Sequence, residues 1–116
     1  MNEQKDHALI PVVKIVNNQA MTTSISVSEF FGKRHKDVLR AIRDLDVPTE
    51  FTERNFAPSE YADITGRKLS MYQMTRDGFT VLAMGFTGRA AMKFKLDYIA
   101  AFNRMEEAIR SEQTAP

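Results

Sequence analysis

The stretch Ser24–Asp46, SISVSEFFGKRHKDVLRAIRDLD, decides the fold that we predict for this chain. Ser26 and Glu29 have the spacing of a capping box, in which each side chain bonds the backbone N–H of the other residue. This spacing predicts a first helix that begins near Ser26. Gly32 then supplies a residue that adopts the left-handed conformation with which helices commonly end. The stretch therefore predicts two short helices separated by a glycine turn.

The second helix is predicted from about His35 to Asp46. Its apolar residues fall at helical spacing and form one buried stripe: Val38, Leu39, Ile42 and Leu45. Lys36, Arg40 and Arg43 lie at i, i+4 and i+7, so they share a face that points away from this stripe. Two helices joined by a glycine turn, the second with a basic outer face, are typical of a helix-turn-helix, whose second helix enters the DNA major groove.

The same pattern has a simpler interpretation. Pairs of short amphipathic helices joined by glycine are common, and Lys and Arg usually line a solvated face. Three carboxylates of this stretch also dilute its positive charge, namely Asp37, Asp44 and Asp46. The net charge of the whole chain is only +1. Any argument for DNA binding therefore rests on where the cations lie, because their sum does not indicate a nucleic-acid partner.

Residues 60–74 carry the clearest β-signal of the chain and predict a hairpin. Gly66 supplies the positive φ that a tight turn requires, and Arg67 and Lys68 follow it at the tip. Behind a helix-turn-helix, a hairpin with a basic tip is what a winged helix uses to reach a neighbouring phosphate or the minor groove. Hairpin tips are exposed in any case, and exposed tips often carry Lys or Arg.

The remaining N-terminal and central segments have weaker signals. We expect residues 1–10 to be a flexible arm, and residues 11–16 to be a strand that ends at Asn17-Asn18. A second short strand is predicted at residues 19–23. Residues 49–59 are predicted to be an irregular connection whose Phe51 and Phe56 anchor it to the core.

The C-terminal part predicts a short helix capped by Thr75 and a long helix over about residues 89–111. The long helix has two apolar faces. One consists of Phe94, Tyr98, Phe102, Met105 and Ile109, and the other of Met92, Leu96 and Ile99. A helix that is apolar over more than half of its girth must be covered on two sides. We therefore expect a homodimer, with the interface at Tyr98, Phe102, Met105 and Ile109.

Composition excludes several classes of function. The chain has 116 residues and no cysteine, and its only histidines are His7 and His35, so neither a disulfide nor a metal site is expected. No apolar run approaches the length that spans a bilayer, and the N-terminus lacks the apolar core of a signal peptide. We expect a cytoplasmic protein without membrane contact. No nucleophile–base set or nucleotide motif is present, so we expect neither an enzyme nor a cofactor.

With these residues laid out, the sequence resembles the Rha family of phage regulatory proteins. The matching pieces are FGKRHKDVLRAIRDL, the Asn55-Phe56 pair and GRKLSMYQMTRDGFTVLAMGFTGRAAMKFKLDYIAAFNRME, which together extend from about Ser24 to Glu107. The resemblance implies a transcriptional regulator of a temperate phage or prophage in a bacterial host cell. Family members often consist of this domain alone or carry it before a second, antirepressor-type domain.

These observations predict one small α+β domain at residues 11–112, of winged-helix type and with a long C-terminal helix. We expect it to bind double-stranded DNA. Phosphate contacts are predicted for the helix start and the wing, and contacts to base edges or backbone for the arginines of the second helix. The predicted contact residues are Lys33, Arg34, His35, Lys36, Arg40, Arg43, Arg67 and Lys68. The alternative is an antirepressor-type module that captures a repressor protein without contacting DNA. Salt separates the two, since only phosphate binding weakens steeply with ionic strength.

Overall fold

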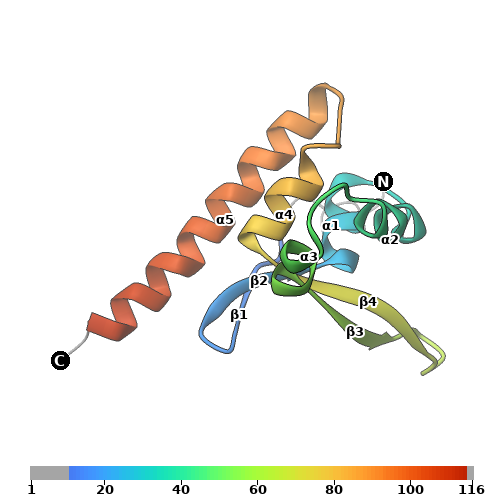
Figure 1. The fold of residues 1–116 in the computed structure, drawn as a ribbon. Coiled ribbons are helices and arrows are strands. Elements are labelled where there is room, and N and C mark those ends of the chain that lie inside the picture. Colours follow the sequence, from blue (N-terminus) through green and yellow to red (C-terminus); the bar gives the residue numbers. More distant parts are fainter. Residues whose placement is uncertain (1–10, 115–116) are drawn as a thin grey trace, which may run out of the picture.

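The computed structural model describes residues 11–114, so the arm predicted at residues 1–10 lies outside the described residues. The element order is β1 (Lys14–Val16), β2 (Gln19–Thr23), α1 (Ser24–Phe31), α2 (His35–Arg43), α3 (Thr49–Asn55), β3 (Phe56–Ala62), β4 (Lys68–Thr75), α4 (Arg76–Ala83) and α5 (Arg89–Thr114). The α+β class and the long C-terminal helix are thus confirmed. In Figure 1 α1, α2 and α4 lie above the strands, α5 runs diagonally to the lower left, and the β3–β4 hairpin projects away from the body.

The sheet has four antiparallel strands in the order β1-β2-β4-β3. The β1–β2 hairpin closes at Asn17 and Asn18, whose φ values of 52° and 63° are those of the tight hairpin turn that asparagine favours. The β3–β4 hairpin closes with Gly66 at φ 87°. Both hairpins are where the sequence predicts them, because their turns depend on residues that tolerate positive φ.

One face of the sheet is covered by helices and forms the core. Ala20, Thr22, Phe56 and Met74 are buried on this face. A cluster of aromatic rings packs above them and joins α1, α4 and α5. In it the Tyr98 ring stacks on Phe79 with centroids 4.5 Å apart. Such ring pairs add about 0.5–1.5 kcal/mol beyond the burial of their area, so this cluster fixes how the helices sit on the sheet.

The start of α1 differs from the prediction. The helix begins at Ser24, and its N-cap is Thr23, whose side chain accepts a hydrogen bond from the Ser26 N–H at 3.1 Å. The capping box predicted for Ser26 and Glu29 is therefore wrong. Thr23 ends β2 with extended dihedral angles, φ −126° and ψ 160°, and an N-cap needs this conformation. The strand consequently passes directly into the helix.

The segment predicted as irregular is ordered, and this prediction is also wrong. It forms α3 and the first half of β3, with Pro48 as the N-cap of α3. The Pro48 carbonyl accepts the Phe51 N–H at 2.9 Å. Phe56 is buried and Phe51 packs partly buried against the core, as predicted. Seven residues are too few to reveal a helical period in sequence. The second helix ends at Arg43, three residues before the predicted Asp46.

Candidate nucleic-acid interface

The turn between α1 and α2 is closed by backbone hydrogen bonds. Gly32 has φ 69° and ψ 34°, and its N–H bonds the Glu29 carbonyl while the Lys33 N–H bonds Ser28. These two bonds form the Schellman motif that left-handed glycine permits. The turn directs Val38 and Ile42 of α2 into the core, where both are buried. The opposite face of α2 is therefore left to solvent.

The exposed face of α2 carries the predicted cations. Lys36, Arg40 and Arg43 are all exposed. Among the described residues, neither Lys36 nor Arg43 has an ion-pair partner. Arg40 donates to Asp37 Oδ1 at 3.0 Å, and Arg34 donates from its Nε to Asp37 Oδ2 at 3.1 Å. Asp37 therefore holds two guanidinium groups along one side of α2 and cancels one of their two charges.

The basic residues around Asp37 lower its pKa. The hydrogen bond from Arg34 lowers the pKa of the Asp37 carboxyl, and the nearby charges of Arg34, Arg40 and Lys36 lower it further. The carboxylate thus stays ionised at neutral pH. Because these side chains are largely exposed, water and salt screen the pairs, which contribute little to stability. Their effect is to restrict the positions of Arg34 and Arg40 on the surface of α2.

His35 lies at the start of α2 but is turned into the protein. Its Nε2 lies 2.8 Å from Ser24 Oγ, and the same oxygen accepts the Tyr72 N–H at 2.9 Å. The His35 and Tyr61 rings also pack edge to face, with their centroids 5.7 Å apart. Burial lowers the pKa of His35 below its usual 6.5, and the opposing effect of the Glu29 charge is smaller. His35 thus joins α2 to β4 through Ser24, a residue that we did not single out from the sequence.

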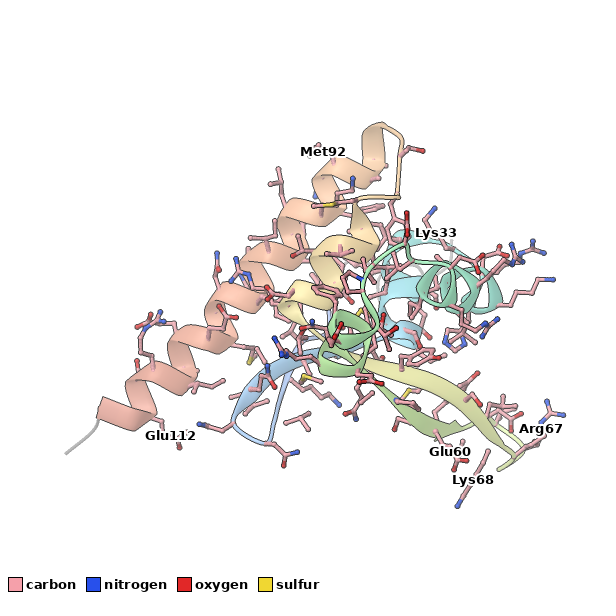
Figure 2. All side chains as sticks on the ribbon, in the orientation of Figure 1. Lys33, Glu60, Arg67, Lys68, Met92 and Glu112 are labelled. Carbon is pink, nitrogen blue, oxygen red and sulfur yellow. The ribbon has the colours of Figure 1, made fainter. Side chains whose placement is uncertain are left out.

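Lys33 points to a different part of the molecule. Its Nζ lies over the ring of Phe86, 4.8 Å from the centroid, in the segment between α4 and α5. In Figure 2 Lys33 lies well away from the labelled Arg67 and Lys68. The structure therefore does not bring Lys33 together with the hairpin tip, although both were predicted to contact the same DNA.

The tip of the β3–β4 hairpin is a closely bonded turn organised by Asp63. Its Oδ1 accepts hydrogen bonds from the Thr65 N–H, the Thr65 hydroxyl and the Arg67 N–H. The Arg67 guanidinium also lies 3.4 Å from Asp63 Oδ2. The hydrogen bond from the Thr65 hydroxyl is the main cause that lowers the pKa of Asp63. Arg67 and Lys68 are exposed at the end of this turn (Figure 2).

The α2 helix and the hairpin tip lie on the same side of the molecule, whereas the C-terminal end of α5 extends to the opposite side (Figure 1). The two elements that carry most of the predicted contact residues, α2 and the hairpin, thus lie on one side in this view. Lys33 instead lies beside Phe86, and the Nε2 of His35 forms a hydrogen bond with Ser24 inside the protein.

The long helix α5 buries the residues that we expected at a dimer interface. Tyr98 and Phe102 are completely buried, at 0% exposure, inside their own chain. The expectation that they contact a second chain is therefore wrong, because their face of α5 packs on the sheet and α1. Met105 is packed against the same core, and Ile109 is half-buried.

The Tyr98 hydroxyl is part of a buried hydrogen-bond chain. It lies 3.2 Å from Thr22 Oγ1, and Thr22 in turn donates to the Val12 carbonyl at 2.7 Å. Since the Thr22 hydrogen is used for Val12, the Tyr98 hydroxyl donates to Thr22. Burial raises the pKa of Tyr98 to about 12, and the hydrogen bond with Thr22 opposes this shift. Tyr98 is thus a neutral core residue.

The outer face of α5 is the one left to solvent. Met92 and Leu96 are 57% and 58% exposed, and Met84 at the end of α4 is 72% exposed. Figure 2 places Met92 near the N-terminal end of α5. An apolar surface therefore remains, but on the face opposite to the one predicted.

An apolar hollow of about 290 Å³ lies between the strands of the sheet and the first turn of α1. Its apolar lining includes Val12, Val16, Met21, Ile25 and Met71. No group of three His, Cys, Asp or Glu side chains suited to a metal ion occurs within residues 11–114. Over the same range, none of the helices is both long and apolar enough to cross a bilayer.

Comparison with known proteins places this arrangement in a family. The family model described as phage regulatory protein Rha matches residues 22–107. An uncharacterised protein of Haemophilus influenzae is 39% identical over 97% of this chain and 67% of its own length. An uncharacterised 22.8 kDa protein from the gp15–gp3 intergenic region of Salmonella phage P22 is 36% identical over 85% of this chain and 51% of its length.

A third relative, derived from the SPbeta prophage of Bacillus subtilis, has the word antirepressor in its name. It is 35% identical over 82% of this chain and 39% of its own length. The chain thus spans about half of the phage P22 relative and less of the SPbeta relative. No solved structure matches it significantly. The family match covers both helices of the candidate interface, the hairpin and most of α5. The chain therefore belongs to the Rha family of phage regulatory proteins.

Proposed function

We propose that this chain is a regulator that binds double-stranded DNA, with α2 in the major groove and the β3–β4 hairpin as the wing of a winged-helix-type domain. The observation that carries this proposal is the exposure of Lys36, Arg40 and Arg43 on α2 and of Arg67 and Lys68 at the hairpin tip. The glycine turn that turns Val38 and Ile42 inward supports a recognition role for α2.

The roles of the side chains follow from their chemistry. Arginine bonds the O6 and N7 of guanine with two parallel N–H groups, so Arg40 and Arg43 are the candidates for reading bases. The Asp37 carboxylate restrains Arg40 before binding, which lowers the entropy lost when the arginine contacts a base. Lys36, Arg67 and Lys68 contact phosphates, which position the protein without specifying sequence.

Selection of bound fragments from the phage genome, followed by fluorescence anisotropy on the selected site, tests this function. Arg40→Ala and Arg43→Ala are each expected to weaken binding by about 1–3 kcal/mol where the arginine reads a base. Both side chains are exposed, so the thermal stability of each variant should match the wild type. Lys14→Ala, on the strand at the opposite edge of the sheet from β3, is the matched control. Wild-type affinity in an Arg40→Ala/Arg43→Ala double variant contradicts the role of α2.

The second candidate is an antirepressor that binds a repressor protein. Two observations favour it: the name of the SPbeta prophage relative and the apolar hollow between the sheet and the first turn of α1. A partner side chain in this hollow makes binding largely insensitive to salt, unlike binding to phosphates. Met71→Glu places a charge in the hollow. It is expected to abolish capture of the phage repressor and to leave DNA binding unchanged, which separates the two functions.

We also propose that the chain forms a homodimer through the outer face of α5, where Met92 and Leu96 are exposed. A symmetric pair presents two α2 helices, and dimeric helix-turn-helix proteins read half-sites about one helical turn apart. This assembly replaces the interface predicted from the sequence with the opposite face of the same helix.

A further inference from the structure

One apolar side chain stands out at the hairpin tip. Ile64 is fully exposed, at 101%, whereas Met84, the next most exposed large apolar residue described, is at 72%. Ile64 lies between Asp63 and Thr65, at the end of the hairpin that projects from the body (Figure 1). Single apolar residues on a surface are common, so exposure alone does not indicate a function for Ile64. The geometry of its turn and the charges beside it indicate one.

The turn that carries Ile64 is fixed by hydrogen bonds on both sides of it. The Asp63 carbonyl accepts the Gly66 N–H at 2.9 Å, which makes Ile64 the second residue of a β-turn. The Asp63 N–H also donates to the Arg67 carbonyl at 2.9 Å, and the Asp63 carboxylate accepts the N–H groups of Thr65 and Arg67. The backbone of Ile64 is thereby held in place, and its β-branched side chain has few χ1 rotamers. A group held in this way loses little entropy when it binds.

The charges next to Ile64 favour a polyanion as its partner. Arg67 is exposed at the end of the turn, and Lys68 is exposed at the start of β4. The nearby carboxylate of Asp63 is occupied by Arg67 and by the hydrogen bonds of the turn. Proteins that bend DNA from the minor groove combine basic side chains with an apolar wedge, frequently isoleucine, leucine or proline, that enters between two base pairs. The hairpin tip has both parts.

We propose that Ile64 is such a wedge: it enters the minor groove, partly unstacks one base step and kinks the DNA. This inference rests on the proposed DNA binding and adds to it a deformation of the duplex. Kinks of this type are about 20–90°. Because pyrimidine–purine steps unstack most easily, the site should prefer such a step at the position of the hairpin tip, without any hydrogen bond to its bases.

Energy transfer between dyes at the two ends of a selected DNA fragment tests the wedge. Wild-type protein is expected to raise the transfer efficiency, because a kink brings the ends together. Ile64→Ala removes the wedge, and Ile64→Thr keeps its β-branched shape but adds a hydroxyl. Both variants are expected to bind with the salt dependence of the wild type and to leave the transfer efficiency near that of free DNA. Ile15→Ala, which alters an exposed isoleucine on β1, is expected to bend DNA as the wild type does.

The outcomes distinguish this inference from the proposed function. If Ile64→Ala bends DNA as strongly as the wild type, or if the wild type leaves the DNA straight, the wedge proposal is wrong. The proposed DNA binding is not affected by either result. Absence of any DNA binding by the wild type overturns both. Loss of repressor capture by Ile64→Ala, with DNA binding and bending unchanged, assigns Ile64 to a protein interface and overturns the wedge. A thermal melt of each variant checks folding, and no change is expected because Ile64 has no buried surface.

Discussion

Removing the charge of the hairpin tip gives the most quantitative test of the interface. The perturbation is the double substitution Arg67→Ala/Lys68→Ala, which leaves the Asp63–Thr65 bonds and the Gly66 turn in place. The exposed cations to which we assign phosphate contacts are Lys36, Arg67 and Lys68. Arg40 and Arg43 are not counted, because we assign them to bases, and Arg34 shares the Asp37 carboxylate with Arg40.

The magnitude follows from counterion release. Each phosphate neutralised contributes about −0.9 to the slope of log affinity against log salt, so three contacts give a slope of up to about −2.7. From 50 to 200 mM salt, such a protein loses about 40-fold in affinity. Without the two tip cations the slope is about −0.9, and the loss over the same range is about 3.5-fold. Sequence preference should not change, because phosphate contacts do not read bases.

Fluorescence anisotropy with the selected site and with a scrambled duplex, at four or more salt concentrations, measures both slopes. Lys14→Ala is again the control and should keep the wild-type slope, because Lys14 lies on the strand at the other edge of the sheet. A double variant with an unchanged slope shows that the tip does not contact phosphates. A changed preference between the two duplexes shows that it reads bases. Either result refutes the role given to the hairpin charges.

Three further predictions concern the body of the protein. Tyr98→Phe removes the hydroxyl that donates to Thr22, so urea unfolding should show a loss of about 0.5–1.5 kcal/mol. The pKa of His35 is lower in the folded chain than its usual 6.5, so its contribution to stability is complete above that pH and is lost as the pH falls through the folded value. Thermal melts at falling pH should therefore show a smaller destabilisation in His35→Gln than in the wild type, and equal losses would contradict the burial of the His35 ring. Leu96→Glu charges the outer face of α5 and should yield a folded monomer, whereas a wild-type protein that sediments as a monomer excludes the dimer outright.

The sequence by itself determined the local structure of this chain. Asn17-Asn18, Gly32 and Gly66 are read directly as turns because positive φ is costly for most other side chains. The exposure of Lys36, Arg40 and Arg43 followed from the period of the apolar residues on α2. The family resemblance was also visible in sequence, and the family match confirms it. Short segments without a clear period were misread, as α3 shows.

The tertiary structure alone decided which neighbours these residues have. The apolar pattern of α5 gives two candidate faces, and only packing against the sheet and α1 selects Tyr98 and Phe102 for the core. The role of His35 likewise depends on Ser24, eleven residues away in sequence, and on the Tyr72 N–H, forty-eight residues from Ser24. Periodicity and capping arise from interactions within a few residues, so a sequence displays them. Burial and hydrogen-bond partners depend on segments that meet only when the chain folds, and for this reason the faces of α5 and the orientation of His35 were settled by the fold.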